Sequence, residues 1–151
     1  MRYGLDYQRT SDIDWFAECG GIPLHIASNG CRLPDVIDRV RNRAIQRQLA
    51  EMEERLIDVV INYAGVRWCL GENGNIYNYL ESFFRFAQLG FVSIDTLRNE
   101  ENLENERGEY VIIAYPKNRR ELIRSQPFYG NLQLPNLELA SLQKLNFDLW
   151  R

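Results

Sequence analysis

The sequence predicts a single α+β domain with an N-terminal β-hairpin, two helices, and then a further antiparallel strand pair packed on the helices. Three observations predict this order. Two alternating runs flank Gly20-Gly21, a stretch with helical periodicity follows Pro34, and two apolar runs with β-branched residues follow Gly90. A length of 151 residues is typical of one domain. We therefore expect one domain over 1–151, in which 117–151 is a less regular C-terminal extension.

The segment 12–29 carries the clearest local pattern. Gly20-Gly21 tolerates the positive φ angles of a two-residue hairpin turn, and such a turn sets the register of the flanking strands. One predicted face is apolar and pairs Cys19 with Ile22, Ala17 with Leu24, and Trp15 with Ile26. The opposite face is predicted to be mostly polar and solvated, and it carries Asp12, Asp14, Phe16, Glu18 and His25. Pro23 cannot donate to a ladder, so its strand is expected at an edge or paired on one side only there.

Two helices are predicted after the hairpin. The stretch 35–64 contains no Gly or Pro and shows helical periodicity, but its last part, 57–64, is rich in β-branched residues. Whether 57–64 continue the helix or form a strand after a break therefore stays open. Residues 65–75 are predicted to be a turn-rich linker. The second helix is expected over about 76–89, with Gly90 as a left-handed C-cap.

The last regular elements are two strands, at 91–96 and 110–115. The second strand has no charged residue, which predicts a central position with both faces covered. Between them lies a loop, 97–109, that is long for a hairpin and carries five glutamates. A loop of this length is typically either functional or mobile.

Composition excludes several classes. A formal net charge of −3 and a pI near 5.3 argue against nucleic acid as a partner, because such proteins are usually strongly basic. The first residues do not resemble a signal peptide, and no stretch is apolar enough for a membrane span. Three cysteines without a C-x-x-C pair are typical of free thiols in a reducing compartment. We expect a cytoplasmic protein with no membrane contact.

Three stretches carry a resemblance to other proteins. They are the hairpin at 12–29, the helix start at Leu33-Pro34, and the strand end Ala114-Tyr115-Pro116. Over most of 12–116 the chain resembles small uncharacterised proteins of gut bacteria. The resemblance implies a bacterial setting and brings no known activity with it.

His25 is the one histidine of the chain and the first candidate for chemistry. The hairpin register places Asp14 and Glu18 on its diagonals, within reach of an imidazole. A carboxylate beside an imidazole can orient a general base, and Cys31 is the candidate nucleophile if the fold brings it close. The alternative to a catalytic role for His25 is ordinary charge pairing that stabilises a solvated sheet face. Metal-ligand spacings and nucleotide-binding loops are absent from the sequence, so we predict neither a metal nor a cofactor.

Binding candidates come from arginines and aromatic residues. Arg39, Arg43 and Arg47 recur every fourth residue and form one line on a helix, where they can hold a carboxylate or phosphate. A second basic cluster follows Pro116 and contains Lys117, Arg119, Arg120 and Arg124. The helix at 76–89 has more aromatic surface than one core face needs, which favours either deep burial or an interface made by Tyr79, Phe83 and Phe86.

The sequence therefore favours a non-catalytic interaction module that binds a protein partner or a second copy of itself. The first alternative is a small hydrolase that uses His25 with Asp14 or Glu18 and Cys31. The second is an acidic inhibitor, of the immunity type, that blocks a basic protein through its glutamate-rich loop at 100–109.

Overall fold

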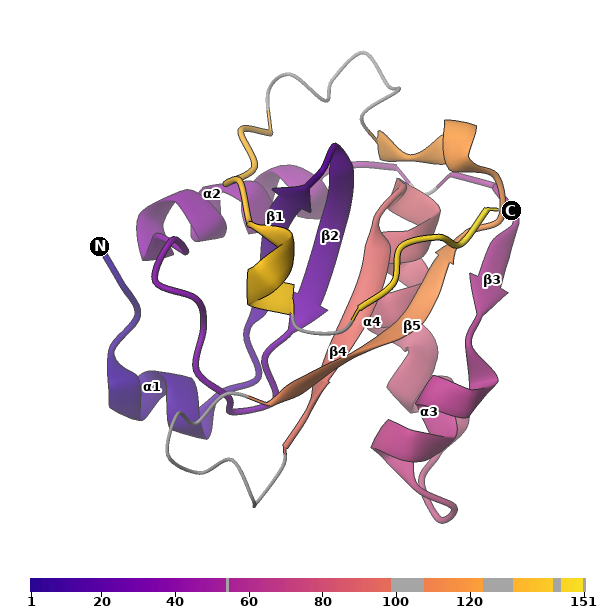
Figure 1. The fold of residues 1–151 in the computed structure, drawn as a ribbon, viewed down its shortest axis with the longest axis horizontal. Helices are drawn as coiled ribbons and strands as arrows, with labels where there is room; N and C mark the ends of the chain where they lie inside the picture. The colour runs from indigo at the N-terminus through magenta and orange to yellow at the C-terminus, as the bar shows by residue number, and fades with distance from the viewer. Residues whose placement is uncertain (54, 99–107, 124–131, 143–144, 151) are drawn as a thin grey trace.

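A computed structural model describes residues 1–53, 55–98, 108–123, 132–142 and 145–150 of the chain (Figure 1). It contains one five-stranded sheet in the order β1-β2-β4-β5-β3. The strands are β1 (Asp14–Cys19), β2 (Ile22–Ala27), β3 (Val59–Ile61), β4 (Val92–Leu97) and β5 (Glu109–Pro116). The helices are α1 (Leu5–Thr10), α2 (Arg39–Ala50), α3 (Tyr63–Leu70) and α4 (Ile76–Leu89). This mixture of one sheet and several helices confirms the α+β prediction.

The hairpin forms with the predicted register. β1 pairs antiparallel with β2, with Cys19 opposite Ile22, Ala17 opposite Leu24 and Trp15 opposite Ile26. Gly20 and Gly21 take φ angles of 55° and 80°, which a two-residue turn of this kind requires. β2 is an interior strand, but its pairing with β4 starts only at Leu24, so Pro23 faces a ladder on one side only, as expected.

The opposite face of the hairpin is not solvated, and this prediction was wrong. Phe16 and His25 are fully buried on that face, and Ala27 is nearly so. The reason is long-range pairing: β2 runs parallel to β4, which makes β2 an interior strand and places this face of the hairpin under α4. The alternation of apolar and polar residues in one hairpin does not show that a helix about 50 residues later covers its second face.

The stretch predicted as one long helix is interrupted, and part of 57–64 forms a strand. α2 ends at Ala50, and Val59–Ile61 form β3, an edge strand paired with β5. The predicted linker at 65–75 is partly helical, because α3 begins at Tyr63 after an N-cap in which Asn62 accepts from the Gly65 amide. α4 spans 76–89 as predicted, and Gly90 has the left-handed φ of 105° expected of its C-cap.

Helices cover one face of the sheet, and mostly irregular segments cover the other. α2, α3 and α4 pack on one face, around Phe16, Ala27, Val111 and Ile113. The other face carries Trp15, Leu24, Ile26 and Ile112 and is covered by the N-terminal loops and by the irregular C-terminal segment, which crosses in front of the sheet in Figure 1. Where it is described, that segment has short 3₁₀ turns at Arg119–Glu121 and Leu139–Leu142, and it buries Leu122, Leu137 and Leu142.

β5 lies between β4 and β3 and is buried over most of its length, which confirms its predicted central position. The glutamate-rich loop falls mainly on 99–107, outside the described residues. Within the described ranges, no helix has the length and apolar character needed to cross a bilayer.

Candidate functional site

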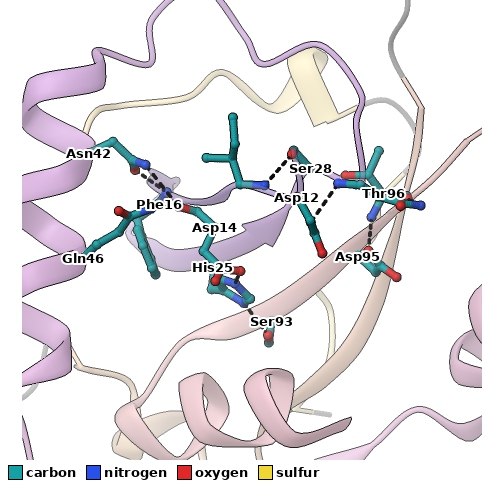
Figure 2. A network of polar contacts seen from close by, with 12 residues as sticks. Asp12, Asp14, Phe16, His25, Ser28, Asn42, Gln46, Ser93, Asp95 and Thr96 are labelled. Atoms are coloured by element: carbon teal, nitrogen blue, oxygen red, sulfur yellow. Dashed lines mark hydrogen bonds and ion pairs between the residues drawn. The ribbon is translucent and has the colours of Figure 1, made fainter. Parts of the chain in front are cut away.

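His25 lies at the centre of a hydrogen-bonded chain of three side chains (Figure 2). Its Nε2 is 2.7 Å from Asp14 Oδ1, and its Nδ1 is 2.6 Å from Ser93 Oγ. The three residues come from β1, β2 and β4, and the Asp14 contact is the diagonal neighbour that the hairpin register predicts. The sheet itself therefore assembles the network.

The partners decide which ring nitrogen carries the proton. An ionised carboxylate only accepts, so the Nε2–H of His25 donates to Asp14. In the neutral ring the Nδ1 lone pair is then an acceptor, and the Ser93 hydroxyl donates to it. Both polar atoms of the buried ring are satisfied in this way, which is the condition for burying an imidazole at low cost.

Aromatic rings seal His25 from solvent. The Phe86 ring of α4 stacks on the imidazole at 4.0 Å between centroids, and the rings of Phe16 and Phe83 lie 5.5 and 5.9 Å away. His25 and Ser93 are both fully buried. Asp14 alone of the three reaches the surface, since its side chain keeps 40% of its exposure.

Two amides of α2 hold the strand that carries Asp14. The Nδ2 of Asn42 and the Nε2 of Gln46 donate to the backbone carbonyl of Asp14 at 3.0 and 2.7 Å, and the Phe16 amide donates to Asn42 Oδ1 (Figure 2). β1 is an edge strand, so these backbone groups would otherwise lack partners. Asn42 also donates to the Tyr3 hydroxyl, which ties the N-terminal segment to the same place.

Asp14 opens into a pocket of about 320 Å³ between the N-terminal segment, β1, α2 and α4. We call it the Asp14 pocket, and its lining residues are Tyr3, Tyr7, Asp12, Ile13, Asp14, Arg43, Gln46, Arg85 and Phe86. Phe86 is therefore shared: one part of its ring covers His25, and the residue also lines the pocket.

Two guanidinium groups flank the Asp14 pocket. Arg43 lies over the Tyr3 ring at 5.7 Å, and Arg85 lies over the Phe86 ring at 5.8 Å. Arg85 also donates to the Leu49 carbonyl at the end of α2. Within the described residues neither arginine forms an ion pair, although two carboxylates line the same pocket. Both guanidinium groups are thus left without a paired carboxylate in this part of the chain.

The other predicted partners of His25 are not brought to its ring. Asp14 and Ser93 occupy both ring nitrogens, so Glu18 makes no hydrogen bond to them. Cys31 packs near the end of β4, where a Cβ on Gly108 would come within 2.9 Å of its Sγ and within 2.5 Å of the Leu97 carbonyl oxygen. Leu97 is four residues along the strand from Ser93, roughly 13 Å at 3.3 Å per residue.

Cys31 also lacks the environment of a nucleophile. It is buried, and burial raises the pKa of its thiol, with Arg98 acting in the opposite direction. A thiol with a raised pKa holds little of the reactive thiolate at neutral pH. The structure therefore separates the predicted nucleophile from the predicted base.

The predicted binding residues divide into two groups. Arg43 and Phe86 line the Asp14 pocket. Arg39 instead contacts Met1, and Arg47 is exposed on α2, away from this pocket. Phe83 lies in the core at 5% exposure, which leaves it unavailable to a partner. The excess aromatic surface of α4 is thus mostly explained by deep burial.

Tyr79 belongs to a second, closed polar cluster. Its hydroxyl donates to Asp95 Oδ2 at 2.6 Å, and the Thr96 amide donates to Asp95 Oδ1 at 2.8 Å. Burial raises the pKa of the Asp95 carboxyl, with these two hydrogen bonds acting against it. Burial likewise raises the pKa of the Tyr79 hydroxyl and, to about 11, that of the nearby Cys69 thiol.

Sequence reasoning missed several residues of the site. Ser93 sits in an apolar strand, and nothing local shows that this strand pairs with the hairpin. Nothing in the sequence distinguishes Gln46 from the other polar residues of α2. Arg85 had a signal, because it is the only basic residue in the aromatic helix at 76–89.

Comparison of the chain with models of known protein families, with curated proteins and with solved structures gives no match. The resemblance to gut-bacterial proteins stays a prediction. Among the described residues, no group of three or more His, Cys, Asp or Glu side chains is placed to hold a metal ion. The geometry of the Asp14 pocket is therefore the main indication of function.

Proposed function

We propose that this chain is a non-catalytic binding protein that recognises an anionic group, a carboxylate or a phosphate, in the Asp14 pocket. The observation that carries the proposal is the pair Arg43 and Arg85. They come from two different helices, they line one pocket, and neither has a carboxylate partner within the described residues. Guanidinium groups bind carboxylates and phosphates through two parallel hydrogen bonds, so two of them make a strong anion site.

The surroundings of the two arginines favour binding. Each guanidinium lies over an aromatic ring, which limits its freedom before a ligand arrives. Arg85 is further held by its hydrogen bond to the Leu49 carbonyl. A site that is ordered in advance loses less conformational entropy when its ligand binds.

The hydrolase alternative is less well supported. Ser93, His25 and Asp14 are the residue types of a hydrolytic triad, and they form a continuous hydrogen-bonded chain. A nucleophile must meet its substrate, however, and both Ser93 and His25 are fully buried, with the Phe86 ring stacked on His25. The network is better suited to fix the position of Asp14 than to attack a bond.

Three other sequence-based proposals have less to support them. Lys117, Arg119 and Arg120 line a larger open groove of about 1140 Å³, but they belong to one short surface turn, and Arg119 lies over the Trp150 ring. Self-association through the aromatic helix would need Phe83 and Phe86, which are buried. The inhibitor alternative depends on the glutamate-rich loop at 100–109, of which 100–107 lie outside the described residues.

Titration of nitrogen-15-labelled protein with inorganic phosphate and with propanoate, followed by NMR, tests the proposal. We expect shifts at the Nε–H groups of Arg43 and Arg85 and at the amides of β1. Arg43→Ala and Arg85→Ala should each weaken binding by about tenfold or more, since a hydrogen bond to a charged group contributes about 1.5–3 kcal/mol.

Two variants serve as matched controls. Arg47→Ala removes an exposed arginine one turn from Arg43 on the same helix, and Arg120→Ala removes one from the open groove. Both should bind the anions as wild type does. Equal losses in all four variants would show non-specific attraction to positive charge and would overturn the proposal, as would the absence of any shift at the Asp14 pocket.

A further inference from the structure

We infer that the ligand of the Asp14 pocket is a small zwitterion, a molecule with an ammonium group beside a carboxylate, as in a free amino acid. The inference rests on the proposed function and extends it: the carboxylate would bind Arg43 and Arg85, and the ammonium would bind Asp14. It starts from the charge of the lining residues, which is balanced, with two arginines and two aspartates around one cavity.

Those opposite charges do not neutralise each other. Neither Arg43 nor Arg85 forms an ion pair with Asp12 or Asp14, although all four line the same pocket of about 320 Å³. A pure anion would be attracted by the arginines and repelled by the two carboxylates. A ligand that carries both charges satisfies both ends, and complementary charge is what gives such a site its specificity.

Asp14 is built to present its carboxylate to the pocket. Its Oδ1 is held by His25 Nε2, while its Oδ2 makes no hydrogen bond within the described residues. The His25 ring that holds it is immobilised in turn by Ser93 and by stacking on Phe86. The backbone of Asp14 is fixed by Asn42 and Gln46. One oxygen of Asp14 is therefore held by a buried support, and the other is left for a ligand in the pocket that Asp14 lines.

The second aspartate has a different position. Asp12 is exposed at the rim, and its Oδ1 accepts from the Asn29 amide at 2.9 Å. It adds negative potential beside Asp14 without the support of a buried partner. Asp14 is consequently the residue assigned to the ammonium group.

Size and apolar surface also fit a small zwitterion. A volume of about 320 Å³ lies at the lower end of the range for small-molecule sites. The pocket includes Phe86 and the stacked rings of Tyr3 and Tyr7, which offer apolar contact to the carbon skeleton of the ligand. A few charged groups together with aromatic rings are typical of small-molecule sites.

Matched probes test the inference by removing one charge at a time. Phenylalanine carries both groups, 3-phenylpropanoate lacks the ammonium, and 2-phenylethylamine lacks the carboxylate. Alanine, propanoate and ethylamine form the same series without the ring, so that steric exclusion of the ring does not hide binding. Affinities are measured by the NMR titration described above, up to tens of millimolar.

We expect the amino acid in at least one series to bind about tenfold or more tightly than either of its one-charge analogues. Asp14→Asn keeps an acceptor for His25 Nε2–H but removes the negative charge, so it should lower amino acid affinity to that of the carboxylate analogue. It should leave the affinity for the carboxylate analogue equal or higher. Asp6→Asn, which removes an exposed carboxylate on α1 outside the pocket, is the control and should bind as wild type does.

The outcomes separate this inference from the proposed function. If propanoate or 3-phenylpropanoate binds as well as its amino acid, and that binding depends on Arg43 and Arg85, the anion site stands and the zwitterion is excluded. If no amino acid binds, this inference is overturned, and the phosphate titration decides the anion site by itself. Circular dichroism of Asp14→Asn verifies that the variant is folded, and an unfolded variant is replaced by Asp14→Ser, which is judged by the same criterion.

Discussion

Asp14 and Asp95 lie in one row across the sheet, separated by Ala27, yet they serve two different clusters. The register places Asp14 opposite Ala27 and Ala27 opposite Asp95, so all three side chains share the face that the helices cover. Asp14 keeps 40% of its side-chain exposure and opens into a pocket. Asp95 is 6% exposed, and Tyr79 and Thr96 occupy both of its oxygens.

The two carboxylates differ because burial changes the environment of one and leaves the other at the surface. At Asp95 the loss of water raises the pKa, and the hydrogen bonds that compensate for it are all internal. At Asp14 the buried partner is a histidine, and the carboxylate itself stays at the surface. The first arrangement is a closed structural cluster, whereas the second leaves one oxygen for a ligand.

The largest effect is expected from opening the cover of His25. Phe86→Ala removes a ring that stacks on His25 and packs edge-on against Phe16 at 5.3 Å, so it should cost about 3–5 kcal/mol of unfolding free energy. Urea denaturation measures it. Phe84→Ala, on the exposed side of the same helix, is the control and should cost clearly less. A loss at Phe86 no larger than the loss at Phe84 would contradict the assignment of Phe86 as the cover.

A smaller effect is expected from Ser93→Ala, which tests whether the His25 network is a support. The substitution leaves the buried Nδ1 of His25 without its partner at 2.6 Å, and an unsatisfied buried polar group costs about 1–3 kcal/mol. Urea denaturation again gives the value, with the exposed Ser82→Ala on α4 as the reference. Stability equal to that of the Ser82 variant would mean that His25 needs no partner at Nδ1.

The smallest effect is expected from Asp95→Asn and appears as a pH dependence. Because the pKa of Asp95 is raised in the folded state, the fold favours the protonated carboxyl. The stability that Asp95 contributes is therefore complete below its unfolded value near 3.8 and declines as the pH rises through the folded pKa. Asp95→Asn removes this titration.

Denaturation midpoints of Asp95→Asn and of wild type, at a series of pH values from acid to neutral, measure the difference in stability between them. The unfolding free energy of the variant relative to wild type should grow as the pH rises. A relative stability that falls with rising pH would show that the hydrogen bonds from Tyr79 and Thr96, rather than burial, dominate at Asp95.

Local sequence patterns predicted the elements whose interactions are close in the chain. Gly20-Gly21 determined the hairpin register, and with it the diagonal contact of Asp14 with His25. α4 begins after Asn75 and ends before Gly90, as predicted, because helix capping involves groups only a few positions apart. The break after α2 stayed open because β-branched residues allow both helix and strand.

The candidate site was predicted only in part, for a physical reason. Arg43 and Phe86 were named as binding residues, and both line the pocket. Arg85 and Gln46 were missed, since the packing of α4 beside α2 depends on long-range contacts. The same limitation placed His25 on a solvated face, because the parallel pairing of β2 with β4 joins residues about 70 positions apart.

Local sequence patterns were therefore sufficient to predict the α+β class, the hairpin with its register, the helix at 76–89 and the contact between His25 and Asp14. Each of these depends on turn geometry, capping or periodicity, which act over a few residues. The folded structure was needed to show that His25 and Ser93 are fully buried while Asp14 reaches the surface. It was also needed to show that Arg43 and Arg85 line one pocket. Those properties depend on which surfaces exclude water, and that is settled only when strands and helices distant in the chain pack together.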